Sequence, residues 1–431
     1  MTSLALARAY LDSQAGREFL QKLYGDGERI LTAQRKRILS LARRFEREFP
    51  DHQDFEICSA PGRTEIGGNH TDHENGRVLA AAINLDALGI AARNDGNSIR
   101  VHSQGYEPVE IYLDALEPNP RERNTSRALV RGICKYLHQQ GYQIGGFDAC
   151  ITSDVPAGSG LSSSASFEML VAEIVNVLFN DWQLDPLALA RAGHFAEVEF
   201  FGKPSGLMDQ VTSAVGGFMA IDFADPALPT VQQVNFGLAS SEYELVIMET
   251  GGSHAGLTSE YTAIKEDHRA VARFFGVSVL RDVEQRKFWN SLPILRREVG
   301  DRAVLRAFHF FEENRRVEEQ VEALNSHNFG RFLALVNESG QSSWTLLQNC
   351  FSCKTPTDQS IPLALALSAQ ILGKRGAWRI HGGGFAGTMQ AFVPRDLLGE
   401  YVKGMERVFG RGACRRLEVR PMGAVRFPVQ E

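Results

Sequence analysis

The amino-acid sequence predicts an α+β fold in two parts. Short apolar runs that end in polar turns, including FEICSAPGR (55–63), FDACITSDVP (147–156) and YELVIMET (243–250), are typical of buried strands. Longer segments, such as the one that begins near Ser162, repeat their apolar residues at helical spacing. Two prolines interrupt the pattern in DFADPALPTV (222–231), so we expect the boundary between the parts there. Strands and helices mixed in this way indicate an α+β protein.

The first part is predicted to begin with a helical extension over residues 1–50. Its charged residues, Arg37 among them, favour one face, which we interpret as solvated rather than as a binding patch. The run VLAAAINLDALGIAARND (78–95) predicts buried strands that end at an Asn-Asp-Gly turn. LALARAGHFAEVEFF (187–201) predicts an amphipathic helix, and VGGFMAIDF (215–223) returns to strand character.

The second part is predicted to be largely helical in its middle. Long helical stretches are expected between about 258 and 375. WRIHGGGFAGTMQAFVP (378–394) then predicts a strand, a glycine turn and a strand, and RRLEVRPMGAVRF (415–427) predicts one or two final strands.

Composition excludes several classes of protein. The 431 residues are 43% hydrophobic and 23% charged, an ordinary globular balance that is enough for two domains. A net charge of −6 argues against a broad basic face for nucleic acid. Six cysteines are too sparse for a disulfide scaffold, and the one CxxC, at Cys350 and Cys353, lacks the further ligands of a structural zinc site. No membrane span or signal peptide is evident, so we expect a cytoplasmic protein, a monomer or weak homo-oligomer.

The stretch PAGSGLSSSAS (156–166) predicts a phosphate-binding loop. Small residues let the backbone approach a ligand closely, and the helix that follows directs its positive end to the same place. One serine would suffice to cap a helix, so three serines together with Gly158 and Gly160 exceed that need. The loop has no lysine for a Walker A motif, and its glycine spacing differs from the dinucleotide-binding fingerprint.

Two further stretches carry polar groups suited to a ligand. GRTEIGGNHTDHENG (62–76) lacks the histidine spacing of HExxH metal sites, and a pocket for a hydroxyl-rich ligand explains its composition better, because each buried hydroxyl needs a partner. Asp209 follows a small-residue turn in SGLMDQ (205–210), where a carboxylate could orient or deprotonate a substrate hydroxyl. The glycines of HGGGFAGTMQAFV (381–393) suit either close approach to a ligand or a tight turn.

Taken in order, these stretches resemble the galactokinase branch of the GHMP small-molecule kinases from about Phe55 to the C-terminus. The matching segments are APGRTEIGGNHTDHENG (60–76), DVPAGSGLSSSASFE (154–168), AEVEFFGKPSGLMDQ (196–210), SHAGLTSEY (253–261) and RIHGGGFAGTMQAFV (379–393). The resemblance implies a two-domain GHMP kinase fold, with a ribosomal S5-like domain at 51–225, a ferredoxin-like domain at 226–431 and the active site between them. Residues 1–50 would form an extension packed on the first domain.

The resemblance also implies roles for single residues. Asp209 matches the catalytic aspartate, near the sugar C1 hydroxyl, and Arg63 matches the arginine that supports it. Ser164 and Glu197 match ligands of Mg²⁺, the implied cofactor. The matching ATP-binding residues are Gly158, Ser159, Gly160, Leu161, Ser162, Ser163, Ser164 and Ala165. The matching sugar-binding positions are Asn69, His70, Asp72, Gly206 and Tyr261.

The implied activity is transfer of the ATP γ-phosphate to the anomeric hydroxyl of D-galactose. Three features depart from the family pattern: Asn69 stands where the family has glutamate, His73 stands where it has tyrosine, and TAIKED (262–267) follows Tyr261 without the arginine cluster that is common there. These departures keep open a related sugar, such as galacturonate, N-acetylgalactosamine or arabinose. A non-catalytic sugar sensor is a further alternative. Sensor relatives can lack the Ser-Ala pair of the phosphate motif, whereas this chain retains both Ser164 and Ala165, which argues against a sensor. The expected partners are the sugar and ATP, with no nucleic acid and no membrane.

Overall fold

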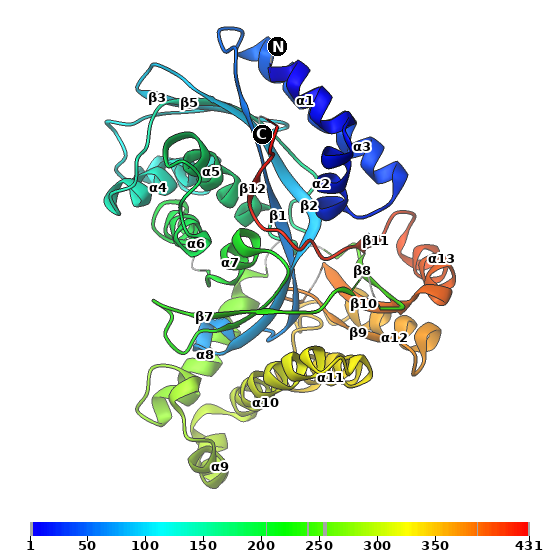
Figure 1. Ribbon diagram of the computed structural model, residues 1–431. Coiled ribbons are helices and arrows are strands. Elements are labelled where there is room, and N and C mark those ends of the chain that lie inside the picture. Colours follow the sequence, from blue (N-terminus) through cyan, green and yellow to red (C-terminus); the bar gives the residue numbers. More distant parts are fainter. Residues whose placement is uncertain (1–2, 204, 239–240, 253–256, 386, 430–431) are drawn as a thin grey trace.

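Two β-sheets and the helices packed on them organise the chain, seen in a computed structural model (Figure 1). The structure describes residues 3–203, 205–238, 241–252, 257–385 and 387–429. The first sheet has eight strands and the second has four, with helices between and around them, which confirms the predicted α+β class. Among the helices of the described ranges, none combines the length and apolar character that crossing a bilayer requires.

The first sheet is built around two long antiparallel strands, β1 (Glu56–Gly67) and β2 (Arg77–Arg93). Its strands run in the order β12-β1-β2-β5-β3-β4, while β6 pairs with the first half of β2 and β7 with β6. The other strands are β3 (Ser98–Ser103), β4 (Val109–Tyr112), β5 (Phe147–Ser153), β6 (Phe218–Asp222), β7 (Thr230–Val234) and β12 (Val425–Arg426). The turn that joins β1 to β2 holds the polar stretch His70–Glu74, which therefore lies at a hairpin tip.

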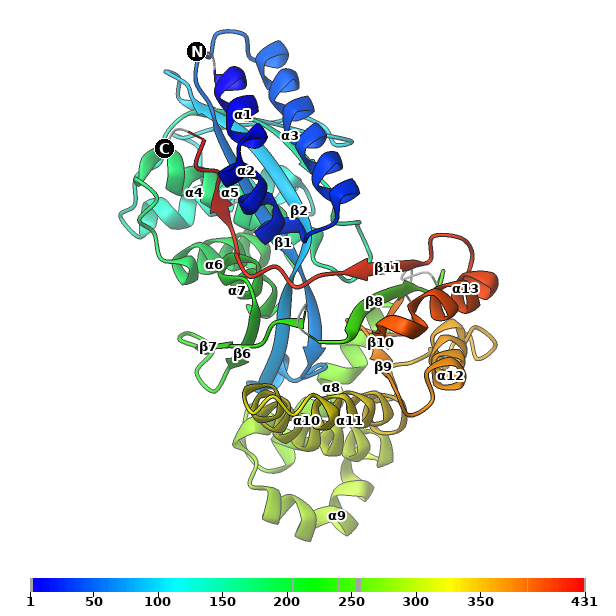
Figure 2. The ribbon, with the colours of Figure 1, turned by 45° about the vertical axis from the view of Figure 1, so that its right-hand side comes forward.

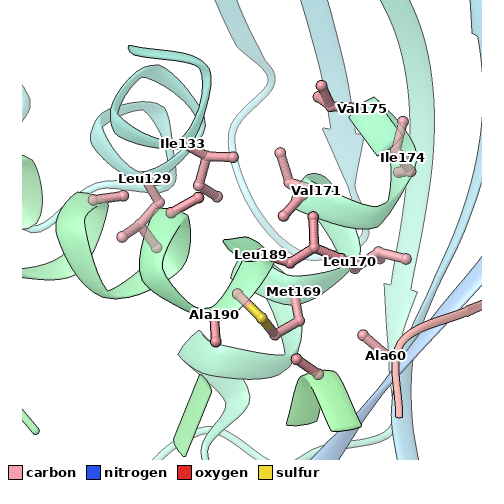
Figure 3. Close-up of a cluster of buried hydrophobic side chains, with 14 of the residues drawn as sticks. Ala60, Leu129, Ile133, Met169, Leu170, Val171, Ile174, Val175, Leu189 and Ala190 are labelled. Carbon is pink, nitrogen blue, oxygen red and sulfur yellow. The ribbon is translucent and has the colours of Figure 1, made fainter. Parts of the chain in front are cut away.

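Different helices cover the two faces of this sheet (Figure 2). On one face lie α4 (Ser126–Gln139), α5 (Ser163–Phe179), α6 (Pro186–Phe195), the π-helical segment η3 (Ala196–Phe201) and α7 (Met208–Val215). On the other lie α1 (Ser3–Asp12), α2 (Gln14–Tyr24) and α3 (Glu28–Glu48). Because side chains alternate along β1, Ile57 packs under the N-terminal helices and Ala60 under α5. Figure 3 shows Met169 and Leu170 of α5 beside Ala60 in that core.

A buried ion cluster fastens the N-terminal helices to the sheet. Arg37 of α3 lies 2.6 Å from the carboxylate of Asp86, which is fully buried on β2. The Tyr24 hydroxyl donates to the same carboxylate at 2.7 Å, and Arg420, near the C-terminus, lies 3.4 Å from it. The prediction of a solvated charged face is therefore wrong for Arg37, whose side chain is only 12% exposed, because Asp86 needs a counter-charge inside the protein.

The second sheet is antiparallel, with the order β11-β8-β10-β9. Its strands are β8 (Tyr243–Glu249), β9 (Ala377–Ile380), β10 (Thr388–Pro394) and β11 (Cys414–Leu417). Its helices are α8 (Thr258–Phe274), α9 (Gln285–Val299), α10 (Asp301–Asn325), α11 (Phe329–Ser342), α12 (Ser360–Leu372) and α13 (Leu398–Phe409). α12 and α13 pack on one face, and α10 and α11 on the other. The division at 225–226 stays a prediction, but pairing assigns β7 to the first sheet and brings β12 back to it.

Candidate active site

The predicted phosphate loop connects β5 to α5. Gly158 and Gly160 both have φ of 74°, a left-handed backbone that glycine adopts without a steric penalty, and Ser162 has φ of 59°. α5 begins at Ser163, so its unpaired first N–H groups and the positive end of its dipole face the loop. This geometry is the one that binding of a phosphate group requires.

Arg63 and Asp209, far apart in the sequence, form an ion pair beside this loop. Arg63 Nε donates to Asp209 Oδ1 at 2.7 Å, and another of its N–H groups donates to the Gly160 carbonyl. The Ser162 hydroxyl donates to the second oxygen of Asp209. Burial opposes ionisation of Asp209, but the charge and hydrogen bond of Arg63 outweigh it and hold the pKa of Asp209 below its ordinary value. Asp209 is thus an oriented anion at neutral pH.

Glu197 gathers the second group of polar side chains. Ser164 Oγ donates to Glu197 Oε1 at 3.3 Å, and Lys203 Nζ lies 2.6 Å from the same oxygen. Ser205 and Gln210 donate to Oε2, and Glu197 itself is 1% exposed. A hydroxyl and a carboxylate are hard oxygen donors of the kind that Mg²⁺ takes, so this pair fits the ion that the family resemblance implies. The described ranges contain no group of three or more His, Cys, Asp or Glu arranged for a metal.

A cavity of about 240 Å³ brings together two of the predicted sugar-binding residues. Asp72, at the hairpin tip, and Gly206 both line it, as does His73. A Cβ atom on Gly206 would lie 2.4 Å from Asp72 Oδ2, so only glycine lets the two residues approach this closely. The cavity is further lined by Lys265 and Arg269 of α8, which the sequence motifs did not indicate.

His70 and Tyr261 both contact the third glycine-rich stretch. His70, at φ of 59°, places its Nε2 atom 2.9 Å from the Gly383 carbonyl, and the Tyr261 hydroxyl donates to the Gly384 carbonyl at 3.1 Å. Within the matching segment SHAGLTSEY, residues 253–256 lie outside the described part of the chain. The structure thus brings His70 and Tyr261 to one loop, at the edge of the hairpin tip that carries Asp72.

The third glycine-rich stretch also joins the signature strand to the phosphate loop. His381 Nε2 lies 3.0 Å from Thr64 Oγ1, and Thr388 Oγ1 donates to the Ser159 carbonyl at 3.3 Å. A Cβ atom on Gly160 would lie 3.1 Å from His381 Nδ1. This stretch is therefore more than a tight turn, because it fixes the position of the loop relative to β1.

The position of Asn69 in the structure differs from the sugar-binding role that the family resemblance implies for it. Its side chain turns inward and is 1% exposed. Its amide nitrogen donates to Glu65 at 2.9 Å and to the Gly382 carbonyl at 2.8 Å, and its amide oxygen accepts from Asn349 at 2.9 Å. The structure places it in the contact between β1 and the glycine-rich stretch, where these bonds leave neither amide hydrogen for a sugar.

We expect Asn69→Glu to lower the free energy of unfolding by about 2 kcal/mol or more. The new carboxylate would lose both donated bonds and would stand against Glu65 and the Gly382 carbonyl, two acceptors. Urea unfolding of both proteins measures the difference, and Asn97→Glu on the exposed surface is the matched control. If the Asn69→Glu protein has normal stability and binds galactose more tightly, residue 69 contacts the sugar directly, as the family resemblance implies.

Several buried histidines surround the hairpin tip and predict acid sensitivity. Burial lowers the pKa of His70 to about 4, and it lowers the pKa values of His73, His309 and His268 as well. Both ring nitrogens of His268 lack a hydrogen-bond partner in the described structure. A lowered folded-state pKa means that folding favours the neutral ring, so the stability it contributes is complete above pH ~6.5 and is lost as pH falls below it.

We therefore expect the Tm of the parent protein to fall more between pH 7 and pH 5 than that of His268→Leu. The variant has no imidazole to charge at this site, so part of the acid penalty disappears. Differential scanning calorimetry at several pH values measures both slopes. Equal slopes would show that His268 does not titrate on unfolding.

A larger cavity, of about 780 Å³, adjoins the phosphate loop and was not predicted. Ser163, Ser164 and Phe167 of α5 line one part of it. The segments 103–109 and 119–129 provide further lining residues. Neither segment carries a recognisable motif, and only the pairing of β3 with β4 and the position of α4 bring them to the loop.

Comparisons with known proteins agree with this geometry. The family model described as "GHMP kinases N terminal domain" matches residues 128–217, and "Galactokinase galactose-binding signature" matches residues 43–93. A galactokinase of Glaesserella parasuis serovar 5 is 31% identical over 361 residues, which cover 82% of this chain and 88% of that protein.

Solved structures show the same fold. The galactokinase of Lactococcus lactis complexed with galactose superposes with a TM-score of 0.76 at 24% identity, covering 90% of this chain and 99% of that one. The mevalonate kinase of Methanococcus jannaschii gives a TM-score of 0.60 at 15% identity, covering 85% and 98%. The two-domain GHMP kinase fold is thereby confirmed. With its family signatures and its curated relative taken together, the chain belongs to the galactokinase family of the GHMP kinases.

Proposed function

We propose that this protein transfers the γ-phosphoryl group of ATP to the anomeric hydroxyl of D-galactose, giving α-D-galactose 1-phosphate. The observation that carries the proposal is the ion pair of Arg63 with Asp209 beside the phosphate loop, with Gly206 of the sugar cavity three residues before Asp209. Phosphoryl transfer depends on positioning and on charge stabilisation, and these two groups supply both. A sugar sensor would have no use for an ionised carboxylate held against a phosphate loop.

Each part of the site takes one task in this reaction. The N–H groups of the loop and of the first turn of α5 bind the phosphates, and the 780 Å³ cavity takes the nucleoside. Asp209 accepts a hydrogen bond from the C1 hydroxyl, and either orients it or receives its proton. Arg63 offsets negative charge on the transferring group, since its guanidinium lies between Asp209 and the Gly160 carbonyl. Asp72, His70 and Tyr261 hold the sugar.

Ser164 and Glu197 are the residues that would hold Mg²⁺. The ion, when bound with ATP, would neutralise charge on the β- and γ-phosphates. Lys203 and Ser205 now occupy the oxygens of Glu197, so a metal would displace the Lys203 ammonium, whose side chain is 49% exposed and has room to move.

Ser164→Ala and Glu197→Gln are each expected to lower kcat by about 10-fold or more at low Mg²⁺, because each removes one oxygen ligand. Raising the Mg²⁺ concentration should recover part of the Ser164→Ala activity. Steady-state kinetics over a Mg²⁺ series measures this, with Ser166→Ala, one turn into α5, as the control. If both variants show the Mg²⁺ dependence of the parent protein, the metal assignment is wrong.

The proposed function is tested by incubating the purified protein with galactose, ATP and Mg²⁺. ADP release measures the rate, and ³¹P and ¹³C NMR identify the phosphorylated carbon. We expect a phosphate on C1 with the α configuration. Sugar binding without ADP release would indicate a sensor, and a product phosphorylated at another carbon would contradict the role of Asp209.

A further inference from the structure

Gln210 is a buried polar residue to which the proposed reaction assigns no task. It follows Asp209 directly in the first turn of α7, and it is fully buried. Asp209 contacts Arg63 beside the phosphate loop. The Gln210 amide contacts two other carboxyl groups, those of Glu168 and Glu197. Burying an amide costs free energy unless its polar atoms are paired, so the bonds that this side chain makes indicate its role.

The amide nitrogen of Gln210 bridges two carboxyl groups from different elements. It donates to Glu168 Oε2 at 2.8 Å and to Glu197 Oε2 at 3.0 Å, which uses both of its hydrogens. Glu168 lies on α5 and is fully buried, and Glu197 lies on the π-helical segment η3 and is 1% exposed. Three elements, α5, η3 and α7, therefore meet at this one amide group.

The two oxygens of Glu197 have separate partners. Oε1 is the oxygen that Ser164 and Lys203 contact, at 3.3 Å and 2.6 Å. Oε2 is the oxygen to which Ser205 and Gln210 donate. Oε1 would be the oxygen available to a metal, since it is the one that contacts Ser164 and the displaceable Lys203 ammonium. Gln210 can therefore fix the carboxylate without competing for that oxygen.

Glu168 in turn supports the Gln210 amide. It lies one turn after Ser164 on α5, at the i, i+4 spacing that places two side chains on one face of a helix. Burial, together with the charge of Glu197, raises the pKa of Glu168 well above its ordinary value, which makes it a neutral acid. Glu168 Oε1 and Gln210 Oε1 are both buried without a hydrogen-bond partner among the described residues. Because a neutral acid carries an O–H donor and an amide oxygen accepts, these two atoms are complementary.

We propose that Gln210, supported by Glu168, is a positioning residue that orients Glu197 as a metal ligand of the phosphoryl-transfer site. The inference rests on the proposed kinase function and adds a residue to its metal site. Because Gln210 and Asp209 share the first turn of α7, the same contact links the position of Asp209 to that of the metal ligand. Replacing a residue that orients a metal ligand by a hydrogen bond typically weakens metal binding by about 10- to 100-fold.

The test measures the Kd of a non-hydrolysable ATP analogue, AMP-PNP, by titration calorimetry with Mg²⁺ and again with EDTA. The Kd with EDTA divided by the Kd with Mg²⁺ reports what the metal adds to nucleotide binding. A loss of packing alone would weaken both measurements and leave this ratio unchanged. In Gln210→Met, which removes the amide at nearly equal length, we expect the ratio to fall by about 10-fold. The Kd of galactose should not change.

Two changes at Glu168 test the support that it gives to Gln210. Glu168→Leu removes both polar atoms and should lower the ratio in the same direction as Gln210→Met. Glu168→Gln keeps an oxygen for the Gln210 amide and has an N–H donor in place of the acid O–H, so it should keep most of the ratio. Glu173→Gln is the matched control and should keep the parent ratio, because Glu173 is a second buried glutamate of α5 whose carboxyl group contacts Asn176 and Trp182 instead.

The outcomes separate this inference from the proposed function. An unchanged ratio in Gln210→Met, shown to be folded by circular dichroism, overturns the inference and leaves the kinase function intact. If Gln210→Met does not fold, Gln210→Asn takes its place, because its amide is one methylene shorter and cannot reach both carboxyl groups; an unchanged ratio there overturns the inference equally. A parent protein that binds AMP-PNP equally with Mg²⁺ and with EDTA also overturns it. A parent protein that does not phosphorylate galactose contradicts the proposed function, while the ratios still decide the role of Gln210.

Discussion

Asp209→Asn is expected to lower kcat for galactose phosphorylation by about 10²-fold or more, with little change in the binding of sugar or ATP. The amide keeps the volume of the carboxylate but removes its charge and one acceptor oxygen. Arg63 and Ser162 both donate to Asp209 in the parent protein, so the amide would also disturb the contact that orients the reacting group. Steady-state kinetics gives kcat, and calorimetry with each substrate gives Kd.

Asp222→Asn is a suitable control, because this carboxylate pairs with Arg77 and Arg281 at the edge of the first sheet and not with the phosphate loop. We expect it to keep the parent kcat. Turnover near the parent value in Asp209→Asn would remove Asp209 from the mechanism. A loss of sugar binding equal to the loss of kcat/KM would assign Asp209 to binding alone.

Asp86→Ala is expected to lower the free energy of unfolding by about 3–5 kcal/mol. Arg420 is fully buried and Arg37 nearly so, and removing their shared carboxylate leaves two positive charges without a partner. The Tyr24 hydroxyl loses its acceptor at the same time. Because these groups come from α2, α3, β2 and the C-terminal segment, we expect one cooperative loss of stability. Urea unfolding measures it.

Asp154→Ala is the matched control, since Asp154 pairs with the same Arg37 at 3.0 Å but is 38% exposed. Water screens this second pair, so we expect a change within about 1 kcal/mol. If both variants lose a similar amount of unfolding free energy, burial of the ion cluster does not determine how much it contributes to stability. A stable Asp86→Ala protein would mean that Arg37 and Arg420 find other partners or reach water.

Features that depend on neighbouring residues could be predicted from the sequence. The strands β1, β5, β8 and β10 and the start of α5 lie where apolar runs and turn residues place them. The phosphate loop could be predicted because its small residues, its serines and the following helix are contiguous, so that one short segment specifies its own backbone. The polar composition of the stretch that holds His70 and Asp72 likewise predicted a ligand pocket, but its place at a hairpin tip came from the structure.

Features that depend on pairing between distant segments of the chain could not be predicted from the sequence. β3, β4 and β7 are short and have no strong pattern. β3 forms on the edge of β5, β4 on the edge of β3, and β7 on the edge of β6. Arg37 has the sequence context of a surface residue, and Asn69 that of a ligand-binding residue. Only tertiary packing buries the first against Asp86 and the second against Asn349.

The sequence by itself determined the fold class and the family, and it predicted Arg63 and Asp209, which the structure pairs, as the catalytic residues. The tertiary structure decided what else lines the cavity beside Asp72, because Lys265 and Arg269 lie almost 200 residues after Asp72 and join it only when α8 packs beside the β1–β2 hairpin. Local patterns record which backbone a segment prefers. The charge of a cavity is a sum over segments that the chain brings together only on folding, so no single segment encodes it.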